Sequence, residues 1–368
     1  MEQSKYKIYS TSEEAWKAMY SAIETAQKSV YWELFIFIDD EVGKTFFDLL
    51  ERKARAGVEV KIIVDFLGSF WLSRKRVLML RDAGVDVIFF YQKMPWRGWW
   101  HTLWSRTHRK ILIVDEEVGY IGGVNIQSYM KDWWDIHVEV RGDIVRALLR
   151  SFARSYVSCG GSKRNVRHLS RKRRVFSREL FTAKLIEDEP NQHHSRIREQ
   201  YTEALRKAKE RVVLFSPYYF PDKQFLRALW KARKRGIKVD LLLPLRTDTR
   251  IATYAAYAWF SFLLKIGVNI RLSDQMMHGK GMIVDDDWAM IGSSNLDQIS
   301  FYDNFEANIR VKDKKFVKKL QETLDGWMLK SKLVDKQVWA KRGWRQRIQE
   351  FIFFRLYYLW SKRARPED

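Results

Sequence analysis

The chain has 368 residues, of which 46% are hydrophobic, and this content excludes a disordered chain. Its 67 lysine and arginine residues outnumber 45 acidic residues, and the formal net charge of +22 indicates a polyanionic partner, either nucleic acid or an anionic membrane surface. The single cysteine, Cys159, excludes a disulfide framework and a cysteine-based metal site, and it fits a reducing cytoplasm.

The aromatic content and the apolar runs bear on the choice between these partners. Aromatic residues make up 15% of the chain, with 16 tryptophans, and tryptophan and tyrosine favour the membrane–water interface. The first residues, MEQSKYKIYSTSEEAWKAM, contain no apolar core of the signal-peptide type. The longest near-apolar run, residues 251–264, is shorter than the roughly 20 residues that a spanning helix needs. We therefore expect any membrane contact to be peripheral.

In chain order, the first half alternates helical and strand patterns, and the second half repeats the series. The patterned segments of the first half are residues 13–40, 49–65 and 80–90, and their counterparts are residues 199–222, 228–244 and 263–272. Glycines such as Gly57 and Gly236 separate a helix from the next strand, as expected of a left-handed helix end. The patterns predict an α/β fold made of two diverged copies of one unit.

Composition divides the chain further. A basic, turn-prone run that begins with paired glycines is typical of a linker, and the repeat ends near Leu333. The predicted parts are a first domain at residues 1–158, a basic linker at 159–180, a second domain at 181–332 and a tail at 333–368.

Each half carries one copy of a polar motif. The first copy is THRKILIVDEEVGYIGGVN and the second is MHGKGMIVDDDWAMIGSSN. In both, His to Lys is two positions, Lys to Asp five, Asp to Gly seven and Gly to Asn three, so the copies correspond throughout. The matched residues are His108, Lys110, Asp115, Gly122, Gly123 and Asn125 in the first half, and His278, Lys280, Asp285, Gly292, Ser293 and Asn295 in the second.

The spacing favours phosphodiester chemistry. Residues two apart on a strand share a face, so each His and its Lys should point the same way, and the two pairs can converge in one cleft. Lysines, with Asn125 and Asn295, would bind the non-bridging oxygens of a phosphate. One imidazole would attack phosphorus and the other would transfer the proton.

The remaining motif positions have simpler explanations. Gly123 and Ser293 are small, as a close approach of backbone to substrate requires. Asp115 and Asp285 come after the apolar strand, which favours turn stabilisation over proton transfer. A metal site is the alternative for two histidines and several aspartates. The lysine beside each histidine would repel a cation, so we expect no metal and no cofactor.

These paired motifs resemble the HxKxxxxD motifs, followed by GG or GS-x-N, of the phospholipase D superfamily, from about residue 6 to 330. Through ARAGVEVKIIVDFLGS, GSSNLDQIS, NFEANI and the tail KRGWRQRIQEFIFFRLYYLW, the chain is similar to bacterial cardiolipin synthases of the short type without N-terminal transmembrane helices. The resemblance implies two phospholipase D-type α/β domains related by a pseudo-twofold axis, each a mixed sheet flanked by helices. It also implies a catalytic set of His108, Lys110, Asp115, His278, Lys280 and Asp285.

The resemblance further implies a phosphohistidine intermediate. His108 would be the nucleophile and His278 the general acid and base, although the symmetry of the motifs leaves this assignment open. An acidic residue downstream of each motif would orient the histidine, and the candidates are Asp135 and Glu306. Both could instead be ordinary carboxylates at a strand edge, and the neighbouring Asp132 leaves the first choice less secure.

Two segments outside the repeat favour contact with a membrane. The inserted run YQKMPWRGWWHTLWSR contributes Trp96, Trp99, Trp100 and Trp104, and the tail contributes Trp344, Phe351 and Arg355. Tryptophans among arginines suit an interfacial loop, although they could also stack on unpaired bases. The tail shows the spacing of a basic amphipathic helix, which could bind a membrane surface or pack on the core.

The sequence therefore predicts a cardiolipin synthase that acts at the cytoplasmic face of the bacterial cell membrane. Its expected partners are the anionic membrane surface and phospholipid substrates, with phosphatidylglycerol as the first candidate and phosphatidylethanolamine as the second, and no nucleic acid. Oligomeric state stays open. The alternatives are a phospholipase D that hydrolyses phospholipids to phosphatidic acid and a nuclease or phosphodiesterase of the same superfamily, for which the positive charge would bind the phosphate backbone.

Overall fold

The structure is a computed structural model that describes residues 5–90, 105–170, 183–190 and 194–362. The chain divides into two compact units, unit 1 (residues 1–185) and unit 2 (residues 186–368). Part of the predicted linker lies outside the described residues.

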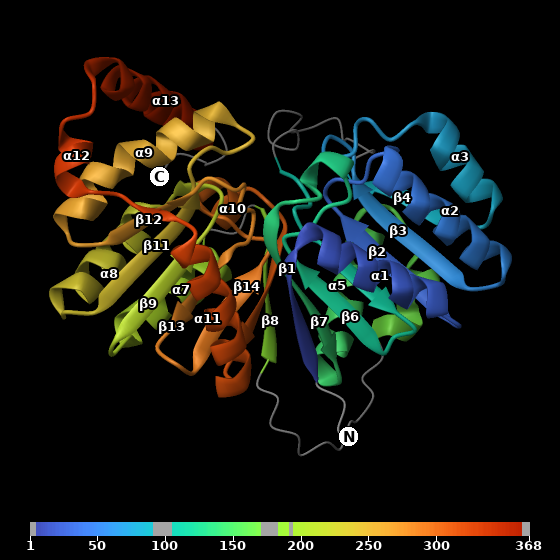
Figure 1. The fold of residues 1–368 in the computed structure, drawn as a ribbon. Coiled ribbons are helices and arrows are strands. Elements are labelled where there is room, and N and C mark those ends of the chain that lie inside the picture. Colours follow the sequence, from blue (N-terminus) through green and yellow to red (C-terminus); the bar gives the residue numbers. More distant parts are fainter. Residues whose placement is uncertain (1–4, 91–104, 171–182, 191–193, 363–368) are drawn as a thin grey trace. The chain divides into compact units, whose positions relative to one another are not determined.

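Unit 1 is built on a mixed β-sheet whose seven described strands have the order β1-β7-β6-β5-β2-β3-β4 (Figure 1). The strands are β1 (Tyr6–Thr11), β2 (Ser29–Leu34), β3 (Glu59–Asp65), β4 (Asp86–Phe90), β5 (Ile111–Val114), β6 (Val118–Gly122) and β7 (Trp134–Arg141). Strands β2, β3 and β4 run parallel, whereas β5, β6, β7 and β1 pair antiparallel. The helices are α1 (Ser12–Thr25), α2 (Glu41–Arg55), α3 (Arg74–Asp82), α5 (Asp143–Ser158) and α6 (Lys163–Val166).

Unit 2 has an eight-stranded sheet, within its described residues, of order β17-β12-β11-β9-β13-β14-β16-β8. Its strands are β8 (Ala183–Asp188), β9 (Arg211–Phe215), β11 (Lys238–Pro244), β12 (Asn269–Ser273), β13 (Gly281–Val284), β14 (Trp288–Gly292), β16 (Glu306–Val311) and β17 (Lys332–Leu333). A separate parallel pair joins β10 (Tyr219–Phe220) to β15 (Leu296–Asp297). The helices are α7 (Arg196–Lys207), α8 (Lys223–Lys234), α9 (Arg250–Lys265), α10 (Gln298–Tyr302), α11 (Lys314–Leu329), α12 (Lys336–Ala340) and α13 (Trp344–Lys362).

The two sheets have the same topology. Read from the other edge, the first sheet is β4-β3-β2-β5-β6-β7-β1, and it matches β12-β11-β9-β13-β14-β16-β8 strand for strand. Parallel pairs correspond to parallel pairs and antiparallel to antiparallel from β4 to β7. The prediction of two copies of an α/β unit, each with a mixed sheet flanked by helices, is therefore confirmed.

Equivalent residues begin and end equivalent helices. The Asp40 carboxylate accepts a hydrogen bond from the Gly43 amide at the start of α2, and Asp222 caps α8 in the same way. After these helices, Gly57 and Gly236 take φ values of +89° and +85°. Only glycine adopts this region without steric cost, so the predicted helix ends are confirmed.

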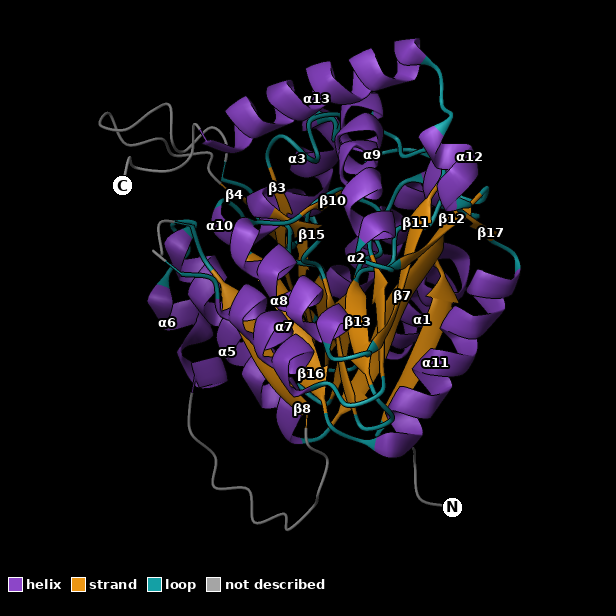
Figure 2. Cartoon of the chain, turned by 90° about the vertical axis from the view of Figure 1, so that its left-hand side faces the viewer, coloured by secondary structure: helices purple, strands orange, loops and turns teal. Residues whose placement is uncertain are grey.

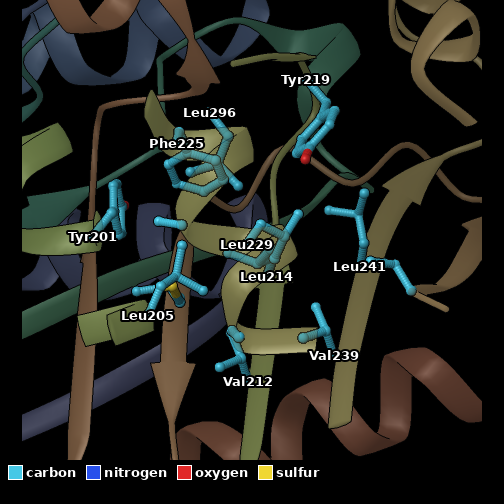
Figure 3. Packing of buried hydrophobic residues seen from close by; sticks show 14 of the residues in the cluster. Tyr201, Leu205, Val212, Leu214, Tyr219, Phe225, Leu229, Val239, Leu241 and Leu296 are labelled. Atoms are coloured by element: carbon cyan, nitrogen blue, oxygen red, sulfur yellow. The ribbon is translucent and has the colours of Figure 1, made fainter. Parts of the chain in front are cut away.

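The core of unit 2 lies between its sheet and its helices. Figure 3 shows Leu214 of β9 and Leu241 of β11 beside Phe225 and Leu229 of α8, and all four are buried. These strands are covered on both faces, which explains their nearly continuous apolar sequences.

The tail is joined to unit 2. Strand β17 extends the sheet by pairing antiparallel with β12, and helix α13 lies along α9 (Figures 1 and 2). The apolar run at residues 251–264 forms most of α9. Phe260 and Leu263 of this helix are fully buried in the core of unit 2. Among the described helices, none has the length and apolarity to cross a bilayer.

Candidate active site

Both His–Lys pairs lie immediately before a central strand. His108 and Lys110 precede β5, and His278 and Lys280 precede β13, so the prediction that they lie on the strands is wrong: each strand begins one residue after the lysine and three after the histidine. The reason is the neighbouring strand: β2 ends at Leu34, and its last pairing with β5 joins Glu33 to Ile111.

The two lysines are held alike. Lys110 Nζ donates a hydrogen bond to the His108 carbonyl oxygen at 2.7 Å, and Lys280 Nζ donates to the His278 carbonyl. All four side chains are buried. Each ammonium group is thus fixed next to the backbone of its histidine, and binding of a phosphate oxygen by these lysines stays a prediction.

Phe35 belongs to the first site and was missed in the sequence. Its ring lies 5.1 Å from the His108 ring in an edge-to-face contact, and Lys110 Nζ lies 5.2 Å from its centroid. One aromatic side chain therefore packs against both motif residues. Its position directly after the apolar strand was the only signal.

The two asparagines follow β6 and β14 and are buried. Asn125 Oδ1 accepts a hydrogen bond from the Ile36 amide at 3.2 Å, and the Asn125 carbonyl accepts one from the Trp16 indole. In unit 2 the Asn295 amide N–H donates to Ser300 Oγ at 3.1 Å. Asn295 Oδ1 has no hydrogen-bond partner among the described residues. A buried amide oxygen without a partner suits a group that binds a ligand.

The small residues of the motif pack against the next strand. A Cβ atom on Gly123 would lie 2.2 Å from Asp135 Oδ1, so any larger residue would clash there. Ser293, in the equivalent place, donates a hydrogen bond to Glu306 and accepts one from the Ala307 amide. The structure therefore explains both residues by contact with β7 and β16, and their predicted contact with substrate remains untested.

The registers of the sheets make Asp135 and Glu306 equivalent. Gly122 pairs with His137, and Gly292 pairs with Asn308, and each acidic residue lies two positions earlier on the same strand. Both carboxylates are buried, whereas Asp132 is exposed. Asp135, and not Asp132, is thus the structural counterpart of Glu306, and the histidine-orienting role of both stays a prediction.

His137 and Asn308 are a second pair that sequence reasoning missed. His137 Nδ1 accepts a hydrogen bond from the Val124 amide at 3.4 Å, and Asn308 Oδ1 accepts one from the Ser294 amide at 3.1 Å. Burial lowers the pKa of His137 to about 4, while the nearby Asp135 raises it and Lys110 lowers it further. His137 is therefore neutral at physiological pH, as an acceptor of this bond must be.

Asp115 and Asp285 lie at the opposite ends of β5 and β13 from the histidines, with the whole strand between them, which is about 13 Å long at 3.3 Å per residue. The Asp115 carboxylate accepts hydrogen bonds from the amides of residues 27, 28 and 29, and Asp285 accepts from those of 209, 210 and 211. These hydrogen bonds tie the loop before β2 to the end of β5, and the loop before β9 to the end of β13, as the expected turn role requires. Membership of Asp115 and Asp285 in the catalytic set stays a prediction.

Comparison with known proteins decides the family. Residues 19–154 and 201–328 match the family described as "Cardiolipin synthase, PLD-like domain". The chain belongs to this family. The predicted resemblance to the phospholipase D superfamily is thereby confirmed, whereas membership of the short type stays a prediction.

Relatives of the cardiolipin synthase family cover most of the chain. A cardiolipin synthase of Geobacillus sp. (strain WCH70) is 34% identical over 312 residues, which are 82% of this chain and 62% of that protein. Cardiolipin synthase B of Salmonella typhimurium is 30% identical over 352 residues, which are 93% of this chain and 85% of that protein. The crystal structure of phosphatidylserine synthase from Haemophilus influenzae has the same fold, with a TM-score of 0.75 at 13% identity over 98% of this chain and 95% of that one.

The two half-sites of this cardiolipin synthase-family chain differ behind the histidines. In unit 1, Thr107 Oγ1 donates a hydrogen bond to Glu33 at 2.5 Å, and the Thr107 amide donates to Asp65 at 3.1 Å. Asp65 also lies 3.6 Å from the Arg106 guanidinium, and its burial raises its pKa against the effect of that charge. These polar contacts hold the residue before His108 on two sides.

Unit 2 has no such cluster among its described residues. The strand registers place Phe215 where unit 1 has Glu33, and Pro244 where it has Asp65. Met277 takes the place of Thr107. The same backbone is thus supported by apolar packing in one half-site and by hydrogen bonds in the other.

The predicted membrane residues fall into two groups. Trp96, Trp99, Trp100 and Trp104 lie outside the described residues. Trp344 and Phe351 lie on α13 with 66% and 62% of their surface exposed, and Arg355, also exposed, has its guanidinium 5.5 Å from the Phe351 ring. Helix α13 packs on the core by one side and exposes apolar residues on the other, so the two predicted alternatives for the tail do not exclude each other.

Proposed function

We propose that this chain is a cardiolipin synthase that transfers a phosphatidyl group from phosphatidylglycerol, or a related phospholipid, to the headgroup hydroxyl of a second phosphatidylglycerol. The main support is one observation: a chain of the cardiolipin synthase family carries two equivalent buried sets of His, Lys and Asn. The chain spans 62% of the length of the Geobacillus relative, so its activity is inferred from its own residues as well.

In the proposed first step, a His108 ring nitrogen attacks phosphorus and the bond from phosphorus to the headgroup glycerol oxygen breaks. His278 donates its proton to that oxygen and glycerol leaves. In the second step, His278 removes the proton from the acceptor hydroxyl, whose oxygen attacks phosphorus and breaks the phosphorus–nitrogen bond. Lys110 and Lys280, fixed beside the histidine carbonyls, would stabilise the charge on the non-bridging oxygens.

The polar cluster of unit 1 supports His108 as the nucleophile. Hydrogen bonds from Thr107 to Glu33 and Asp65 restrain the backbone next to this histidine. A nucleophile benefits from restraint because attack requires the reacting atoms to lie about 3–3.5 Å apart. In unit 2, Met277 takes the place of Thr107 and makes no side-chain hydrogen bond of this kind within the described residues.

The exposed face of α13 supports attachment to an anionic membrane surface. Trp344, Ile348, Phe351, Ile352 and Leu359 are exposed on it, with Arg345, Arg347 and Arg355 also on the helix surface. Each basic residue near an anionic bilayer contributes about 1 kcal/mol, and buried aromatic rings add to this. We place the enzyme peripherally at the cytoplasmic face of the bacterial cell membrane.

The test is an incubation of the purified protein with phosphatidylglycerol vesicles, followed by mass spectrometry of the lipids. We expect cardiolipin from the wild type and none from His108→Ala or His278→Ala. Phosphatidic acid alone would identify a hydrolase. No lipid product, with phosphatidylethanolamine also tried, would reject the lipid activity and lead to assays on single-stranded DNA.

A further inference from the structure

The inner side of α13 reaches the loop of the second motif. Tyr357 is only 3% exposed, although Phe351 and Leu359 on the same helix are largely exposed. Its ring lies 4.5 Å from that of Phe220 in β10, and Phe354 contacts Phe220 and Trp259. This aromatic packing restrains the Tyr357 ring and therefore the position of its hydroxyl group.

The Tyr357 hydroxyl group contacts the buried carboxylate of Asp297. Tyr357 OH donates a hydrogen bond to Asp297 Oδ2 at 3.1 Å, and Asp297 Oδ1 accepts one from the Ser300 amide at 2.7 Å. Asp297 is the last residue of β15 and caps α10. Its two oxygens therefore join the tail helix to the turn that follows the second motif.

That turn holds the motif asparagine. Ser300 Oγ accepts a hydrogen bond from the Asn295 amide at 3.1 Å, and the next amide, of Leu296, donates to Ser216 Oγ at 3.1 Å. Ser300 is fully buried, so its hydroxyl has little freedom. The Asn295 side chain, with an Oδ1 that lacks a partner in the described part of the chain, extends from this restrained backbone.

We propose that Tyr357 is a positioning residue for the second half-site, acting through Asp297 and Ser300 to hold Asn295 where it binds the phosphate. This inference rests on the proposed function. Helix α13 then has two roles in one element, because its outer face takes the lipid surface and its inner face fixes a substrate-binding residue.

The electrostatics of Asp297 explain why one hydroxyl matters. Burial raises the pKa of Asp297 to about 7, the Ser300 amide and the Tyr357 hydroxyl lower it, and Glu306 raises it. Loss of the tyrosine hydroxyl removes one of the groups that stabilise the carboxylate. A protonated Asp297 accepts hydrogen bonds more weakly and holds the Ser300 turn less firmly.

The experiment compares Tyr357→Phe with a matched control, Tyr257→Phe. Tyr257 lies on α9 and donates its hydroxyl to the Leu245 carbonyl at 2.5 Å, so its variant also loses one hydrogen bond. On phosphatidylglycerol vesicles we expect Tyr357→Phe to lower kcat by about three- to tenfold, the effect of one hydrogen bond, with KM and vesicle flotation unchanged. We expect Tyr257→Phe to keep the wild-type kcat.

A double-mutant cycle separates positioning from a general loss of stability. If Tyr357 acts through Asp297, the kcat of Asp297→Asn should fall no further when Tyr357→Phe is added. Additive losses, or a wild-type kcat for Tyr357→Phe, would overturn the proposal.

Amide hydrogen exchange tests the same point without activity. Exchange at the Asn295 amide should be faster in Tyr357→Phe and unchanged in Tyr257→Phe, and equal exchange in the two variants would refute the positioning role. A wild type that forms neither cardiolipin nor phosphatidic acid would instead reject the proposed function, whatever the exchange result.

Discussion

Asp115 allows the clearest test between a catalytic and a structural role. The superfamily motif includes this residue, whereas its hydrogen bonds lie in a turn. Its carboxylate accepts hydrogen bonds from the amides of Gln27 at 2.9 Å, Lys28 at 2.7 Å and Ser29 at 3.0 Å. We consider Asp115→Gly, because Asp115 has a φ of +53° that glycine adopts without strain. The variant therefore loses the carboxylate without adding backbone strain to the folded state.

The magnitude follows from the exposure of the three amides. A hydrogen bond to a charged group contributes about 1.5–3 kcal/mol. The amides of Gln27 and Lys28 are exposed and would bind water instead, so only the partly buried Ser29 amide loses its full contribution. We expect a loss of about 2 kcal/mol, comparable to removal of a helix cap. For a unit of this size that is about 4–8 °C in Tm.

The assay is thermal unfolding together with lipid turnover at 20 °C, where the variant stays folded. We expect a lower Tm and a kcat within about twofold of the wild type, since a group that contacts no reacting atom leaves the barrier unchanged. Asp115→Asn should lie in between, because its amide oxygen still accepts. Glu117→Gln is the control, as its ion pair with Lys28 is long, at 3.8 Å, and exposed. A hundredfold loss of kcat with the wild-type Tm would refute the turn role.

Three further predictions test other parts of the molecule. The folded pKa of His137, about 4, is below its ordinary 6.5, so up to about 3 kcal/mol of stability is present above pH 6.5 and lost as pH falls to 4. His137→Asn, which copies Asn308 of unit 2, should remove this acid sensitivity in urea unfolding. Thr107→Val should lower the free energy of unfolding by about 1–3 kcal/mol, since it leaves a buried carboxylate without its hydroxyl donor. Phe351→Ser with Arg355→Ser should weaken flotation with anionic vesicles by fivefold or more at an unchanged Tm, because both residues are exposed.

Each of these has an outcome that contradicts it. An unfolding curve of His137→Asn with the wild-type pH dependence would show that this imidazole does not titrate as inferred. Equal free energies of unfolding for Thr107→Val and the wild type would show that the hydrogen bond from Thr107 to Glu33 does not stabilise unit 1. Undiminished flotation of the α13 variant would direct attention to another basic surface, and flotation with neutral vesicles serves as its control.

The repeat and the motif could be predicted because they are periodic. Equal intervals from His108 to Asn125 and from His278 to Asn295 appear in the chain itself, whereas Asp135 and Glu306 were candidates that only the family resemblance implied. The strand order of both sheets agrees with that repeat. Helix ends at glycine also depend on local backbone sterics alone, which neighbouring residues determine.

The pairing of His137 with Asn308 could not be predicted in this way. Their chemical types differ, and their equivalence appears only when the registers place each beside a motif glycine. The same holds for Tyr357 and Asp297, which lie 60 positions apart and belong to a helix and a strand that no local pattern connects.

By itself, therefore, the sequence determined the class of fold, the duplicated unit and the side chains available for phosphodiester chemistry, since all of these depend on spacing and local conformation. The tertiary structure decided which of those side chains support the others. It assigned Asp115 and Asp285 to turns, placed Thr107 on buried carboxylates in one unit only, and connected α13 to Asn295 through Tyr357. The physical reason is that a buried polar group needs a partner, and only the packing of distant segments determines which partner is near.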